Sequence, residues 1–104
     1  MADMALRFNN IKLSAPLEKQ EGGYTESSVL AKLEAYDMLI SLAKAPNAAA
    51  ERISYEAERL RRLPLKRVKG GLFSKNGYSV EQVDKLIEEL DSQIIAALKN
   101  KYIS

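Results

Sequence analysis

An apolar stripe with the spacing of a helix seam occurs twice in this chain of 104 residues. In each copy, apolar side chains follow one another at alternating intervals of four and three residues, which places them on one face of a helix, as in a coiled coil. An isolated amphipathic helix of this length is only marginally stable in water, so each stripe needs a partner in the same chain or in a second copy. The stripes are Val29, Leu33, Tyr36, Ile40 and Ala43, and Val83, Ile87, Leu90, Ile94 and Ala97.

Capping residues and prolines predict a helical hairpin in the first two thirds of the chain. Thr25 can cap a helix over about 26–45. Asn47 can cap a second helix over about 48–63, which ends before Pro64 because the residue preceding a proline disfavours the helical conformation. The short link between these two helices makes them antiparallel neighbours.

A third helix and two short extended segments complete the predicted secondary structure. Ser79 begins a capping-box pattern, which predicts a final helix that runs to about residue 101. Extended segments are expected near 5–13 and 66–75, and Asn76-Gly77 can supply a tight turn. The predicted fold class is therefore mainly α, a helical hairpin plus a C-terminal helix with a coiled-coil-like seam.

Residues 54 positions apart match along the two stripes, which indicates an internal repeat. The pair Gly23-Tyr24 falls on Gly77-Tyr78, and the helices that follow share apolar and acidic positions. Two copies are too few for a solenoid, so the repeat indicates duplication of one turn-plus-helix unit. The chain is predicted to be a single domain, residues 1–104, with two related units over about 22–45 and 76–99.

Cysteine and histidine are both absent, and their absence removes most familiar catalytic chemistry. Disulfides, thiol nucleophiles, Cys/His zinc sites and Ser-His arrangements all need one of these residues. The acidic residues show no metal-ligand or general-acid spacing, so we expect a protein that is not an enzyme and holds no cofactor or metal. An enzyme built only from Lys, Ser, Tyr and carboxylate side chains is the catalytic alternative. No stretch has the length of a membrane span or the pattern of a signal peptide, so the expected location is cytoplasmic.

One segment is strongly basic, although the formal net charge of the chain is only +2. Residues 59–69 contain six cations and no acid, and a Leu-Phe pair follows after two glycines. Such a segment can hold an anionic membrane or an acidic protein while its apolar side chains insert, or it can grip the phosphates of a nucleic acid. Alternatively, Arg59 and Arg62 pair with acids of a neighbouring helix and the Leu-Phe pair lies in the core. The residues predicted to bind a membrane or partner are Arg59, Arg61, Arg62, Lys66, Arg67, Lys69, Leu72 and Phe73.

The stretch over 63–94 resembles the N-terminal domain of the DivIVA-like bacterial cell-division proteins. In that family, a loop ending in Gly-Tyr leads into a helix with a Glu-x-Val-Asp-x-hydrophobic pattern. The matching residues here are Gly77, Tyr78, Glu81, Val83, Asp84 and Ile87. Gly23 and Tyr24 begin a second, duplicated copy of the motif, which lacks the Val-Asp pair. The resemblance implies a non-enzymatic scaffold that dimerises as a coiled coil and touches the membrane or division partners through its loops.

These patterns together predict a self-associating scaffold or adaptor. The homodimer is expected to form through the second stripe, Val83 to Ala97, together with Val29, Leu33, Tyr36 and Ile40 of the first. The basic loop is expected to contact a membrane or a protein partner, which would place a cytoplasmic protein at the membrane periphery. A small nucleic-acid-binding protein is the alternative function, although no aromatic platform interleaves the charges. No small-molecule substrate is expected.

Overall fold

A computed structural model describes residues 8–13, 15–69 and 76–103 of the chain. Within these residues, the secondary structure consists of three helices and one two-stranded antiparallel ribbon. The elements in chain order are β1 (Lys19–Glu21), α1 (Glu26–Lys44), α2 (Ala50–Arg61), β2 (Asn76–Tyr78) and α3 (Val80–Ile103). The predicted mainly α fold class is confirmed, with α1 and α2 forming the helical hairpin and α3 the C-terminal helix.

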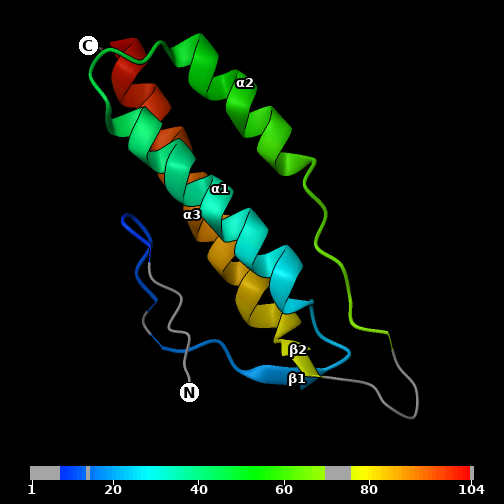
Figure 1. Cartoon of the computed structure of the whole chain (residues 1–104). Helices are drawn as coiled ribbons and strands as arrows, with labels where there is room; N and C mark the ends of the chain where they lie inside the picture. The colour runs from blue at the N-terminus through cyan, green and yellow to red at the C-terminus, as the bar shows by residue number, and fades with distance from the viewer. Residues whose placement is uncertain (1–7, 14, 70–75, 104) are drawn as a thin grey trace.

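Helices α1 and α3 both begin at the β ribbon and run side by side in the same direction, whereas α2 runs the opposite way (Figure 1). Helices joined by a short loop are antiparallel, so a parallel pair in one chain needs a return path. Helix α2 and the segment after it supply this return. The longest and shortest extents of the molecule are 54 and 17 Å. The molecule is therefore elongated rather than spherical.

The core combines residues of both predicted stripes with one face of α2. Val29, Leu33 and Val83 have no exposed surface, and α2 adds Ile53 and Leu60. Full burial of an aliphatic side chain of this size stabilises the fold by about 1.5–3 kcal/mol, so these contacts hold the parallel helices together. The buried stripe residues are Val29, Leu33, Tyr36, Ile40, Ala43, Val83, Leu90 and Ile94, with Ile87 and Ala97 partly buried beside them.

Side-chain caps define the starts of α1 and α3. The Thr25 hydroxyl accepts a hydrogen bond from the Ser28 N–H at 3.2 Å, as the sequence predicts. The Ser79 hydroxyl accepts one from the Gln82 N–H at 3.3 Å. The Gln82 side chain does not complete a capping box, because its Oε1 accepts the Glu18 N–H at 2.6 Å instead. This hydrogen bond between Glu18 and Gln82 ties the segment before β1 to the first turn of α3.

The predicted cap of the second helix at Asn47 is wrong. Helix α2 begins at Ala50, and its N-cap residue, Ala49, makes no side-chain hydrogen bond. The chain is still reversing direction at this point, since the Ala48 N–H donates to the Ala45 carbonyl at 3.3 Å. The helix therefore starts only after this turn is complete.

The β ribbon joins segments that lie far apart in sequence. Strands β1 and β2 are antiparallel, and the paired residues are Lys19 with Tyr78, Gln20 with Gly77 and Glu21 with Asn76. The predicted turn at Asn76-Gly77 is therefore wrong, because both residues lie in β2. Arg67 lies in an isolated bridge inside the extended segment expected near 66–75. Residues 70–75 lie outside the described residues.

Two glycines let the Gly-Tyr pairs approach each other across this ribbon. The Tyr24 N–H donates to the Tyr78 carbonyl at 3.0 Å, and the Tyr78 N–H donates to the Tyr24 carbonyl at 2.8 Å. A Cβ at Gly23 would lie 2.2 Å from the Tyr78 carbonyl oxygen, and a Cβ at Gly77 would lie 2.2 Å from that of Tyr24. Each glycine thus makes room for the other pair's tyrosine, so the contact is reciprocal. This contact places the starts of α1 and α3 together.

The N-terminal segment packs on α1 without forming a strand. Within the expected extended segment near 5–13, the described residues 8–13 carry no strand. The Asp37 carboxylate instead accepts the N–H groups of Asn9 and Asn10 at 3.1 and 2.6 Å. Ile11 follows and is buried against the core. The backbone hydrogen bonds of this segment thus go to a side chain of α1 rather than to a second strand.

Candidate binding surface

The basic segment, residues 59–69, begins on the last turn of α2 and continues beyond it. Arg59 and Arg61 lie close to acids one turn earlier on the same helix, with Nη1 to carboxylate distances of 3.3 Å to Glu56 and 3.4 Å to Glu58. Exposed pairs at this spacing contribute only about 0.2–0.5 kcal/mol, so they offset part of the positive charge without fixing the side chains. Among the described residues, neither arginine pairs with an acid of a neighbouring helix, in contrast to the alternative interpretation of Arg59.

The backbone of the basic segment is anchored beside the ribbon. The Thr25 N–H donates to the Lys66 carbonyl, and the Val68 N–H donates to the Gly23 carbonyl, both at 2.7 Å. The Lys66 N–H donates to the Ser28 hydroxyl at 3.1 Å. These bonds give residues 66–68 a fixed path against the start of α1.

Arg67 packs on Tyr24 at the centre of this anchored stretch. Its Nε donates to the Gly22 carbonyl at 2.6 Å, and its guanidinium carbon lies 6.0 Å from the centre of the Tyr24 ring. The Tyr24 hydroxyl donates to the Asp84 carboxylate on α3 at 2.8 Å. Burial and this hydrogen bond raise the pKa of Tyr24, while the nearby Arg67 charge opposes the rise. Arg67 is nevertheless exposed to solvent.

Three further cations of the segment, Arg62, Lys66 and Lys69, are exposed. Within the part of the chain that the structure describes, none of them forms an ion pair. The remaining predicted binding residues, Leu72 and Phe73, lie outside the described residues. The described part of the segment is therefore an exposed cationic surface whose backbone is anchored at residues 66–68.

An apolar groove between α1 and α2 lies next to the basic segment. Its volume is about 380 Å³. Met38, which is 74% exposed, forms part of the α1 wall, and the buried Leu39 and Leu60 form the floor. The complete lining is Ala35, Met38, Leu39, Leu42, Arg52, Glu56, Arg59, Leu60 and Leu63. The sequence pattern did not reveal this groove, because Met38 and Leu42 lie outside the predicted stripe and become neighbours of α2 only in the folded hairpin.

The residues predicted to form an interface between two copies lie inside one chain. Val29, Leu33, Tyr36, Ile40, Val83, Leu90 and Ile94 are buried by the chain's own helices, and Ile87 and Ala97 are partly buried. Helices that pack within one chain show the same spacing of apolar residues as helices that pack between two chains. The spacing therefore could not distinguish an internal core from a dimer interface. A homo-oligomer of this fold would have to use another surface.

The residues that resemble the DivIVA-like motif gather where the ribbon meets α3. Gly23, Tyr24, Gly77 and Tyr78 form the reciprocal contact, Val83 is in the core, and Glu81 and Asp84 are exposed on the first turns of α3. Of these acids, Asp84 accepts the Tyr24 hydroxyl and so links the first Gly-Tyr pair to the second helix. In this fold, the motif residues therefore hold the ribbon against the start of α3.

A buried lysine that the sequence pattern did not predict links α1 to the end of α2. Lys32 of α1 is only 7% exposed, and its ammonium donates to the carbonyls of Leu63 at 2.7 Å and Leu60 at 3.3 Å, at the end of α2. A cation is favourable at this negative end of the α2 dipole. Burial lowers the pKa of Lys32, and the carboxylate of Asp91 on α3 opposes the shift. Asp91 in turn accepts the Tyr36 hydroxyl at 2.6 Å.

A second lysine caps the other end of the helical hairpin. Lys101 of α3 donates to the Ala45 carbonyl at the C-terminus of α1, at 2.9 Å.

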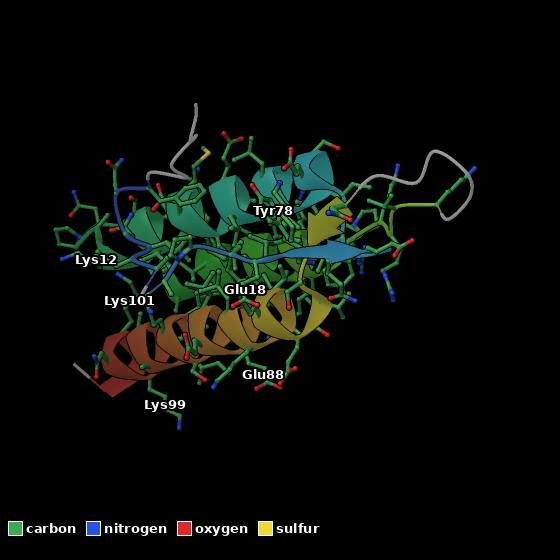
Figure 2. All side chains as sticks on the ribbon, turned by 90° about the horizontal axis from the view of Figure 1, so that it is seen from below. Lys12, Glu18, Tyr78, Glu88, Lys99 and Lys101 are labelled. Carbon is green, nitrogen blue, oxygen red and sulfur yellow. The ribbon has the colours of Figure 1, made fainter. Side chains whose placement is uncertain are left out.

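Figure 2 shows Glu88 and Lys99 projecting from α3 on the side away from the other helices. This outer face of α3 is therefore charged, in contrast to the apolar groove between α1 and α2.

No group of acidic side chains with the arrangement of a metal site occurs among the described residues. None of the helices, over the residues described, is long and apolar enough to cross a membrane. Comparisons with protein-family models, with curated proteins and with solved structures find no match. The fold and the surface therefore define the chain as a small helical bundle with a cationic segment beside an apolar groove.

Proposed function

We propose that this chain is a non-enzymatic adaptor that holds an acidic protein partner through the basic segment. One observation carries the proposal: the backbone over 66–68 is fixed against the ribbon, while the side chains of Arg62, Lys66 and Lys69 are exposed without an ion pair among the described residues. The backbone at residues 66–68 is already fixed and so loses little conformational entropy on binding, and the charge of the segment attracts an anionic partner over about 8–10 Å at moderate salt.

The resemblance of the Gly-Tyr segments to DivIVA-like proteins supports a scaffold or adaptor rather than an enzyme. It also suggests a bacterial cell-division context and a membrane as a second anionic surface. Insertion into a membrane would depend on Leu72 and Phe73. An acidic protein partner needs only the cations that the structure places, so it is the partner we propose.

The test is a binding titration against three anionic probes. A labelled 20-residue polyglutamate peptide, vesicles with phosphatidylglycerol and a DNA duplex would each be titrated at low and moderate salt. The test variant replaces Arg62, Lys66 and Lys69 with glutamine. The control replaces the exposed Lys12, Lys85 and Lys99 with glutamine, so it removes the same charge elsewhere.

The expected result is weaker peptide binding in the test variant alone. If each exposed cation contributes about 0.5 kcal/mol, three of them amount to about 1.5 kcal/mol, or roughly tenfold in affinity. Equal loss in the test and control variants would mean that only net charge matters, and the proposal would fail. Tighter binding to vesicles or DNA than to the peptide at the same salt would overturn the acidic-protein partner.

A further inference from the structure

The groove between α1 and α2 is an apolar surface that none of the other described segments lines. Its α1 wall consists of residues three and four positions apart, Ala35, Met38 and Leu42, which share one helix face. Met38 is 74% exposed, whereas Leu39 beneath it is 4% exposed. An unbranched, polarisable methionine over a buried leucine is well suited to adapt to an inserted side chain.

The α2 wall of the groove adds charge. Arg52 and Arg59 alternate with Glu56 along this wall, and Glu56 pairs with Arg59 at 3.3 Å. Arg52 has no acidic partner among the residues that the structure describes. Arg62 lies one turn beyond Arg59, where the basic segment continues. An element lying in this groove would therefore meet positive charge along α2.

The shape of the groove selects the kind of element that fits. From residue 35 to residue 42, α1 rises about 10 Å, or two turns, which matches apolar anchors at i, i+3 or i+4, and i+7 of another helix. Three helices with an open groove on the outside of a hairpin can accept a fourth helix, as in four-helix bundles. Charge complementarity then requires acidic residues on the flank of that helix that faces α2.

We propose that this groove binds an amphipathic helix of a partner protein, with its apolar face on Met38, Leu39 and Leu42 and an acidic flank against Arg52. The inference rests on the proposed adaptor function and gives the acidic partner a structural element. In this arrangement, the groove holds the apolar face and the basic segment extends the charged contact beyond the end of α2.

The experiment selects peptides against the whole chain. A phage library of helix-forming peptides about 18 residues long, randomised on all faces, would be enriched on the wild-type chain and depleted on the immobilisation support alone, and the Met38→Lys variant would be kept for the later measurements. Met38 is so exposed that this substitution should leave the fold intact, and circular dichroism checks that it does. The expected peptides carry large apolar residues at i, i+3 or i+4, and i+7, with Glu or Asp along one flank.

Two matched pairs of variants then test the site with a selected peptide. Met38→Lys and Arg52→Glu should each weaken binding at least tenfold. Ile95→Lys and Lys99→Glu on α3 should change it less than twofold, since neither residue lines the groove or belongs to the basic segment. Failure to enrich any peptide, enrichment of basic or non-amphipathic peptides, or equal effects of the test and control variants would overturn the proposal.

The same peptide separates this inference from the proposed function. If glutamine at Arg62, Lys66 and Lys69 weakens binding while Met38→Lys does not, the adaptor function stands and the groove proposal fails. If Met38→Lys weakens binding while the glutamine variant does not, the groove stands and the basic segment is not the holding surface.

Discussion

Substitution of Gly77 by alanine should break the reciprocal contact between the two Gly-Tyr pairs. A Cβ at this position would lie 2.2 Å from the Tyr24 carbonyl oxygen and 2.8 Å from the carbonyl carbons of Gly23 and Tyr24. All three atoms belong to the backbone, so no rotation of a side chain can relieve the overlap. The segments must move apart, and the two hydrogen bonds between Tyr24 and Tyr78, at 3.0 and 2.8 Å, are then weakened or lost.

The magnitude follows from these contacts. Two backbone hydrogen bonds contribute about 1–3 kcal/mol together, and the displaced start of α3 adds about 1 kcal/mol of disturbed packing. We therefore expect the free energy of unfolding to fall by about 2–4 kcal/mol, a large part of the 5–15 kcal/mol or so typical of a domain. Urea unfolding followed by circular dichroism at 222 nm measures this change, and the melting temperature should drop by roughly 10–20 °C.

Two other glycines provide matched controls. Gly22 has a φ of +74°, and a Cβ added there would meet no atom within 4 Å, so Gly22→Ala should cost only the backbone strain of about 1–2 kcal/mol. Gly23→Ala should resemble Gly77→Ala, because its Cβ would lie 2.2 Å from the Tyr78 carbonyl oxygen. The reasoning is refuted if Gly77→Ala destabilises the chain no more than Gly22→Ala does.

Lys32 and the hydrogen bond between Tyr36 and Asp91 give two further predictions. Lys32→Met keeps the aliphatic stem but leaves the Leu63 carbonyl without its donor, so urea unfolding should show a loss of about 1–2 kcal/mol; no loss would mean that the ammonium does not stabilise α2. Burial and the hydrogen bond to Asp91 raise the pKa of Tyr36 well above its ordinary value. The Tyr36 hydroxyl therefore stabilises the fold fully below about pH 10 and less above it. The free energy of unfolding that Tyr36→Phe removes should accordingly be smaller at pH 11 than at pH 8. An equal loss at both pH values would contradict this.

Local signals predicted the helices well. Thr25 and Ser79 cap α1 and α3 because the hydroxyl of each accepts a hydrogen bond from the N–H three residues later. Such a cap depends only on residues that are neighbours in the sequence, so it can be predicted. The stripes predicted most of the buried residues of α1 and α3, since periodicity fixes a helix face, but they missed Leu39 and Leu86 and included the only partly buried Ile87 and Ala97. Periodicity could not predict whether the partner face belongs to the same chain.

The ribbon and the groove depend on contacts between distant residues, and for that reason they could not be predicted. Each strand has only three residues, too few for an alternating pattern, and Gly77 is needed because of a carbonyl 53 positions earlier. One feature of the sequence does indicate that Lys32 is buried. It lies among the apolar positions of α1, and the residue 54 positions later is Leu86, which is buried. A charged residue at a core position predicts a buried polar partner.

The most direct test of the adaptor function is a nuclear magnetic resonance titration of the ¹⁵N-labelled chain with a peptide selected for binding. The shifts in backbone amide resonances identify the surface that the peptide contacts. Our account predicts that the largest shifts cluster on residues 35–42 of α1, 52–61 of α2 and 62–69 of the basic segment. Shifts concentrated on the outer face of α3, around Glu88 and Lys99, or spread evenly over the chain would contradict it.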